Sequence, residues 1–107
     1  MIFRRSRFDD LVGRQLDLFA EDEAELLGEA EQADEAQTRA GRDEAEELYG
    51  DYQLVVDEIA ERLLDVRETY AATLVPDAAD DYCVAFTREA RKRFRVYADL
   101  LADVEPD

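Results

Sequence analysis

Residues 49–74, YGDYQLVVDEIAERLLDVRETYAATL, contain the pattern that decides the fold. Apolar and aromatic side chains recur in this stretch at alternating spacings of three and four residues, which places them on one face of an α-helix. The series is Tyr49, Tyr52, Val56, Ile59, Leu63, Val66 and Tyr70, and Leu74 closes it. Pro76 ends the segment because it lacks an N–H and disfavours helical geometry at Val75. We therefore expect one long helix over about residues 43–75.

Similar patterns lie on both sides of this segment. The series before it is Val12, Leu16, Phe19, Glu23, Leu26, Ala30, Ala33, Gln37 and Ala40. The series after it is Ala79, Cys83, Phe86, Ala90, Phe94, Tyr97, Leu101 and Val104. They predict helices over about residues 7–40 and 78–104. We expect Asp43 to cap the second helix, with Glu46 as its capping-box partner, and Asp77 to cap the third.

The chain shows no strict period-two alternation of the kind that indicates strands. The expected connections are short, so successive helices must run antiparallel. We therefore predict an all-α fold: an antiparallel three-helix bundle, or a coiled-coil-like helical hairpin plus a third helix. Residues 1–107 are expected to form a single helical domain, with residues 1–6 and 105–107 frayed.

Register arithmetic predicts a protruding tip on this fold. If the first turn centres between residues 41 and 42, residue i of the first helix lies level with residue 83 − i of the second. A second turn centred on Pro76 places residue j of the second helix level with residue 152 − j of the third, so that Val104 lies level with Leu48. Beyond that level only two helices remain, and Gly50 lies level with Ala33, a pairing that favours close backbone approach. We expect a protruding two-helix acidic tip.

Composition excludes several classes of function. The chain has 29 acidic and 13 basic residues, a formal charge of −16, and no histidine. This charge disfavours nucleic acids and anionic membranes as partners, and the lack of histidine removes most zinc hydrolases and Ser-His or Cys-His nucleophile systems. Cys83 is the only cysteine, and no apolar run is long enough for a membrane helix. We expect no cofactor, no catalytic site, no metal site, and, without a secretory signal, a cytoplasmic location.

Charged residues are segregated into three places along the chain. The acidic tip contains Glu29, Glu31, Asp34, Glu35, Asp43, Glu44, Glu46 and Glu47. A basic stripe with helical spacing consists of Arg88, Arg91, Lys92 and Arg95. The tip is either a solvated surface or a docking site for a basic partner, and the stripe either binds an acidic partner or a phosphate or neutralises acidic helices of the same bundle. An N-terminal basic arm with Arg4, Arg5 and Arg7 either binds a partner or folds its phenylalanines against the bundle.

Individual residues also carry expectations. Glu23 interrupts the first apolar series, and the register places it opposite Arg93 or Lys92, which we expect as its ion-pair partner. Cys83 lies within the third apolar series and is expected to be an inert buried thiol. Four of the five tyrosines fall on the three series, where core packing with the hydroxyl reaching solvent is expected; they are Tyr49, Tyr52, Tyr70 and Tyr97.

The sequence favours a non-enzymatic helical protein–protein interaction or assembly module. Apolar residues outside the three series, such as Leu11 and Leu18, provide more apolar surface than one bundle needs, so we expect self-association as a homodimer. Two alternatives stay open at this point. One is a carboxylate-based metal-binding protein or enzyme. The other is an acidic nucleic-acid mimic that inhibits a DNA-binding protein.

Overall fold

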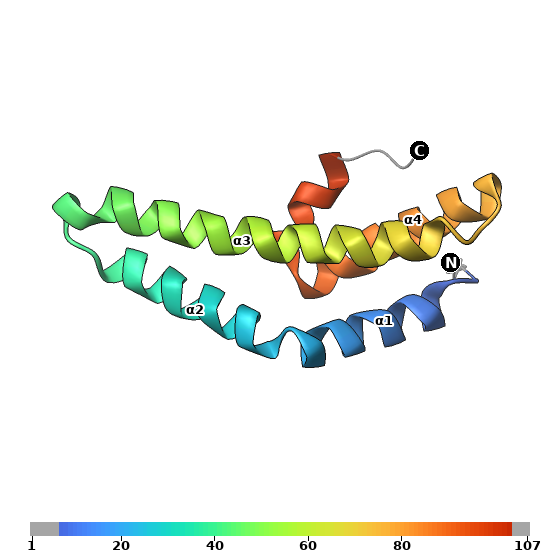
Figure 1. The fold of residues 1–107 in the computed structure, drawn as a ribbon, viewed down its shortest axis with the longest axis horizontal. Coiled ribbons are helices and arrows are strands. Elements are labelled where there is room, and N and C mark those ends of the chain that lie inside the picture. The colour runs from blue at the N-terminus through green and yellow to red at the C-terminus, as the bar shows by residue number, and fades with distance from the viewer. Residues whose placement is uncertain (1–6, 104–107) are drawn as a thin grey trace, which may run out of the picture.

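The computed structural model describes residues 7–103, and within that range every regular element is a helix. The elements are α1 (Asp9–Asp22), α2 (Ala24–Arg39), α3 (Arg42–Ala71), α4 (Pro76–Arg93), the short α5 (Arg95–Ala98) and the 3-10 helix η1 (Asp99–Asp103) (Figure 1). The all-helical prediction is confirmed for the described part of the chain. The predictions for residues 1–6 and for Val104 and the residues after it lie outside that part.

The helix starts differ from the predicted caps. α3 begins directly after an extended Gly41 (φ −70°, ψ 166°), whose carbonyl accepts hydrogen bonds from the N–H groups of Glu44 and Ala45. Asp43 therefore lies inside the first turn, and the predicted capping box is wrong. α4 begins at Pro76, whose missing N–H suits the first helical position. Asp77 is likewise not the cap but a first-turn acid, where the helix dipole favours negative charge.

The predicted first helix is bent at Glu23. This residue has φ −107° and ψ 21°, between the end of α1 and the start of α2. Its N–H still donates to the Phe19 carbonyl at 2.9 Å, and its own carbonyl accepts from the N–H of Leu27 at 2.9 Å, so Glu23 remains hydrogen-bonded to both helices although its own backbone is not helical. α2 consequently lies along α3, whereas α1 packs principally against α4 (Figure 1). One continuous helix over residues 7–40 is therefore a wrong prediction.

A second break divides the predicted third helix at Phe94, which has φ −130° and ψ 49°. The Phe94 ring packs edge-on against Phe19 of α1, with ring centroids 5.6 Å apart. After the break, α5 and η1 pack against α3 instead of continuing along α4. The chain thus turns back across the middle of α3 (Figure 1).

The core follows the three apolar series for most of their length. Its buried members come from α1, α2, α3, α4, α5 and η1 and include Val12, Leu16, Phe19, Leu26, Ala30, Ile59, Leu63, Cys83, Phe86, Ala90 and Leu101. The ring centroids of Tyr70 and Tyr82 lie 4.8 Å apart. This agrees with the predicted register, which places residue 70 of the second segment level with residue 82 of the third. Tyr82, outside the series, is fully buried, while Tyr49, inside it, is 54% exposed. The expectation for Tyr49 is therefore wrong.

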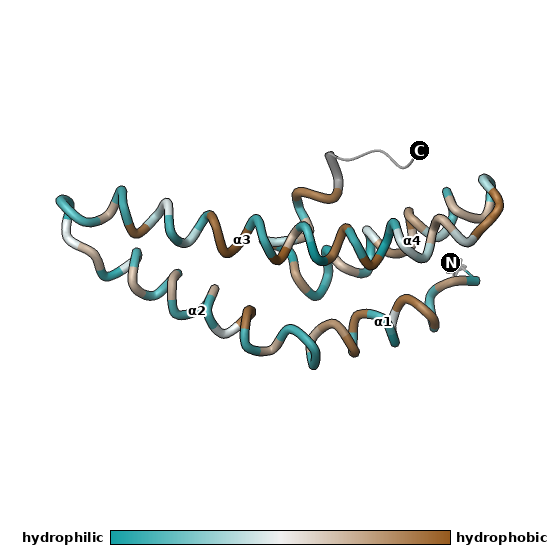
Figure 2. Tube along the Cα trace, viewed as in Figure 1, coloured by the Kyte–Doolittle hydropathy of each residue, from teal (hydrophilic) through white to brown (hydrophobic). Residues whose placement is uncertain are grey.

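The molecule is elongated, with extents of 50 × 30 × 27 Å and a radius of gyration of 15.9 Å. A compact domain of this length has a radius of gyration of about 13 Å. The extension comes from α2 and the first half of α3, which continue past the region covered by α4 (Figure 1). Figure 2 shows that this end is mostly hydrophilic. The predicted close approach at Gly50 is wrong, because nothing lies within 4 Å of the place that a Cβ would occupy there.

Candidate interaction surface

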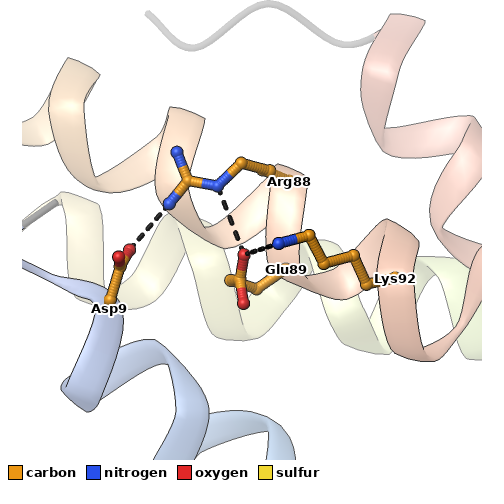
Figure 3. A network of polar contacts seen from close by, with 4 residues as sticks. All are labelled: Asp9, Arg88, Glu89 and Lys92. Carbon is orange, nitrogen blue, oxygen red and sulfur yellow. Dashed lines mark hydrogen bonds and ion pairs between the residues drawn. The ribbon is translucent and has the colours of Figure 1, made fainter. Parts of the chain in front are cut away.

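The basic stripe is occupied largely by ion pairs within the chain. Arg88 Nη2 lies 2.7 Å from Asp9 Oδ1 of α1, and Arg88 Nε lies 3.2 Å from Glu89 Oε2 (Figure 3). Lys92 Nζ lies 3.0 Å from the same Glu89 oxygen. The hydrogen bond from Lys92, and then that from Arg88, hold the pKa of Glu89 below its usual value. This cluster fastens α4 to the start of α1.

The other two cations of α4 also pair with acids of the same chain. Arg91 Nε lies 3.3 Å from Asp99 Oδ1, and Arg93 Nη1 lies 2.5 Å from Asp17 Oδ1 of α1. Arg95 is exposed and makes no ion pair with any residue in the range 7–103. Arg93 is therefore paired with α1, as its position suggested, but through Asp17. The predicted partnership of Glu23 with Arg93 or Lys92 is wrong.

Glu23 pairs instead with α3. Arg62 Nη1 donates to Glu23 Oε1 at 2.5 Å, and Arg62 Nη2 donates to Glu58 Oε1 at 2.9 Å. These hydrogen bonds, the one to Glu23 first, raise the pKa of Arg62. The pair joins the bend between α1 and α2 to the middle of α3. The expected register places Glu23 level with Ala60 of the second helix, so Arg62, two residues further on, lies near that level; the prediction chose a partner on the third helix instead.

The eight acidic residues predicted at the tip are all exposed. Few cations accompany them. Arg39 Nη2 lies 3.8 Å from Glu35 Oε2. The neutral side chain of Gln37 donates a hydrogen bond to Asp34. Glu31 and Asp34 lie near Tyr97 of α5, whose pKa is raised first by burial and then by the neighbouring tyrosine and acids. No ion pair joins these acids to the basic stripe within residues 7–103. The two predicted surfaces are therefore separate.

A groove separates α1 from α3 on the side that α4 leaves open. It encloses about 210 Å³ and is lined by Gln15, Leu18, Phe19, Asp22, Glu23, Arg62 and Val66. We call it the α1–α3 groove. Leu18, Phe19 and Val66 give it an apolar lining, and the Arg62–Glu23 ion pair lies at its wall. Leu18 is 56% exposed although it is a large apolar residue. The sequence placed Leu18 outside the core series, but it did not indicate that α1 and α3 would separate here.

The outward surface of α1 continues from this groove. Leu11, Arg14, Leu18 and Asp22 are spaced by three, four and four residues, so they lie on one face of the helix. We call this face the outer stripe of α1. Leu11 is half-buried and the other three are exposed. Among residues 7–103, neither Arg14 nor Asp22 takes part in an ion pair. The stripe combines an exposed leucine with one positive and one negative charge.

The polar groups buried in the core make hydrogen bonds within the chain or are shielded from solvent. The Tyr82 hydroxyl donates to Gln15 Oε1 at 2.8 Å, and burial raises the pKa of Tyr82 well above its ordinary value despite this hydrogen bond. Burial also raises the pKa of the Cys83 thiol, which disfavours the reactive thiolate. Arg67, only 1% exposed, donates to Thr87 Oγ1 at 2.9 Å. Sequence reasoning missed Arg67, although it lies four residues after the buried Leu63.

The basic arm falls only partly within the described residues. Arg4 and Arg5 lie outside them. Arg7 Nη2 lies 3.9 Å from Asp81 Oδ2, and its guanidinium stacks 5.0 Å from the centre of the Phe8 ring. Phe8 in turn packs edge-on against Tyr82, with centroids 5.6 Å apart. Within the described part, this segment folds against the helices.

Three further findings concern metal ligands, membrane spans and known proteins. No group of three or more potential ligand residues of the kind that holds a metal ion occurs within residues 7–103. None of the helices in the same range has the length and hydropathy that crossing a bilayer requires. Comparison with models of known protein families, with curated proteins and with solved structures found no match to this chain. The contacts of the chain itself are therefore the basis for a functional proposal.

Proposed function

We propose that this chain is a non-enzymatic helical protein–protein interaction module that assembles with a second copy of itself. The observation that carries the proposal is the α1–α3 groove with Leu18 exposed at its edge. A helical bundle gains stability when its apolar groove is covered, and a helix from a second molecule can cover the α1–α3 groove. In this assembly, the acidic tips remain exposed on both copies and keep the dimer dispersed in water.

A second copy fits this surface better than a strongly charged partner does. The outer stripe carries one cation, Arg14, and one anion, Asp22, so the face has no excess of either sign. An isologous contact places the same face on both sides, so a suitable two-fold axis can set each charge against its opposite on the other copy. The basic stripe is a weaker candidate for a binding surface, because Arg88, Arg91 and Lys92 already have acidic neighbours in the same chain.

The proposed interface is small, and its affinity should be correspondingly modest. One exposed leucine, the groove lining and a charged rim lie at the low end of specific interfaces, below about 1,200 Å² of total buried surface. We therefore expect a reversible dimer with a dissociation constant between about 1 µM and about 1 mM. Its molar mass should rise with protein concentration towards twice that of the chain.

Light scattering over a concentration series tests the proposal with two matched variants. Leu18→Asp places a charge in the groove and should abolish the concentration-dependent rise in mass. Leu54→Asp makes the same chemical change at a residue that is 70% exposed, on α3 and outside the groove lining, and should dimerise as the wild type does. A wild type that stays monomeric throughout, or two variants that lose the dimer equally, would contradict the proposal.

A further inference from the structure

We infer that two copies meet through antiparallel α1 helices, with a two-fold axis at Leu18 and with Arg14 of each chain paired with Asp22 of the partner subunit. This inference rests on the proposed self-association and adds the register of the interface. It commits the surface to a second copy of this chain and names the charges that would align it.

The spacing of the outer stripe defines this register. In an antiparallel pair of helices related by a two-fold axis, residue i faces residue N − i, and N is twice the position of the axis. An axis at Leu18 places the two exposed leucines against each other. Arg14 and Asp22 lie four residues on either side of Leu18, so each faces the other type across the interface. A single two-fold axis thus brings the two leucines together and pairs each charge with its opposite.

The state of these charges in the single chain supports the assignment. Most cations near α1 are already paired: Arg88 with Asp9, Arg93 with Asp17, and Arg62 with Glu23. Within residues 7–103, Arg14 and Asp22 are exposed and take part in no ion pair. A partner subunit can therefore engage both without breaking an intramolecular contact.

A neighbouring register is disfavoured by charge. An axis midway between residues 14 and 15 would place Leu11 against Leu18 of the partner subunit and bury more apolar surface. The same axis would bring Arg14 close to Arg14 of the partner subunit, and like charges held together across an interface are repulsive. The two registers therefore make opposite predictions for one substitution: removing the positive charge of Arg14 weakens the first and strengthens the second.

A neutral substitution and a charge swap decide between them: Arg14→Gln should weaken a dimer with its axis at Leu18 and strengthen one with its axis between residues 14 and 15. The dissociation constant of the dimer is measured by sedimentation equilibrium at about 0.15 M salt, where the Debye length of about 8 Å reduces general repulsion between acidic chains. Arg14→Asp and Asp22→Arg should each raise the dissociation constant about tenfold, because each turns two attractions into two repulsions. The double variant, Arg14→Asp with Asp22→Arg, should return it to within about threefold of the wild type.

Matched controls separate local pairing from net charge. Arg42→Asp and Asp51→Arg alter the charge by the same amounts at exposed residues of α3 near its start, away from the groove lining. Both should leave the dissociation constant within about threefold of the wild type. Thermal melts at low protein concentration check that every variant folds.

The outcomes distinguish this inference from the proposed function. A wild type that is monomeric at all concentrations overturns both. A wild-type dimer that Arg14→Gln strengthens or leaves unchanged overturns the register alone, as does a double variant that remains as weak as the single ones. Rescue in the double variant, with the two controls unaffected, supports the antiparallel α1 interface.

Discussion

Arg67 is a charged side chain that the fold has taken almost completely out of water. It is 1% exposed, donates to Thr87 Oγ1 at 2.9 Å and lies 3.1 Å from Glu68 Oε1. A buried ionic group of this kind offsets a large desolvation cost with its hydrogen bonds, and its net contribution to stability is often small. The packing of Arg67 contributes to stability separately from its charge, because the aliphatic stem fills space between α3 and α4.

Two substitutions at Arg67 separate packing from charge. Arg67→Ala should lower the free energy of unfolding by about 3 kcal/mol, because it leaves a cavity in the core. Arg67→Met keeps most of the volume and should lower it by only about 1 kcal/mol, the cost of the lost hydrogen bonds. Urea denaturation followed by circular dichroism measures both values. Equal losses in the two variants would show that the ionic contacts, and not the packing, stabilise this position.

Burial at single positions was only partly predictable from the sequence. Leu16, Leu63 and Phe86 lie on their expected core faces because apolar periodicity determines which face of a helix avoids water. Tyr82 is fully buried and Tyr49 is half exposed, the reverse of what the series indicate. The periodicity gives the direction of a side chain but not which helix lies beside it, and Tyr49 lies in the first half of α3, which continues past the region covered by α4 (Figure 1).

At the scale of elements, the helices were predictable and their bends were not. The breaks at Glu23 and Phe94 contain neither proline nor glycine, the usual sequence marks of a bend. Contacts between segments accompany both: Arg62 binds Glu23, and Phe19 packs against Phe94. Because these partners lie 39 and 75 residues away in sequence, local patterns do not encode the bends. The expected pairing of Glu23 failed for the same reason.

Gly50 is a weak point within α3. It lies in the helix interior, is exposed, and has open space where a Cβ would be placed. Gly50→Ala should raise the free energy of unfolding by about 0.5–1 kcal/mol, because alanine loses less backbone entropy on folding. Thermal melts should show a midpoint higher by about 2–5 °C.

A second glycine provides the control for this substitution. Gly41 precedes α3 in an extended conformation, where alanine gains no helical advantage and is a poorer N-cap than glycine. Gly41→Ala should therefore leave the melting midpoint unchanged or slightly lower. A drop in the midpoint of Gly50→Ala would mean that a neighbouring helix does approach this position closely in solution.

At the scale of the whole molecule, the sequence indicated the charged surfaces but not the groove. The acidic residues of the tip and the cations of the stripe were identifiable because charge runs and helical spacing are local properties. The groove depends on the separation of α1 from α3, which lie far apart in sequence and meet only in the folded chain. Leu18 therefore appeared only as an apolar residue outside the series, and its position beside Val66 required the three-dimensional arrangement.

The net charge of −16 makes the stability of the whole molecule depend on salt. The acids that the sequence placed at a tip are exposed on α2 and α3 with few cations beside them, so folding concentrates like charges. Raising NaCl from about 0.05 M to about 1 M shortens the Debye length to about 3 Å and should raise the melting midpoint, measured at low protein concentration. Replacing Glu44, Glu46 and Glu47 by Gln should raise the midpoint at low salt and flatten its salt dependence. A midpoint that falls with added NaCl would instead show that the ion pairs around α1 and α4 dominate over repulsion at the tip.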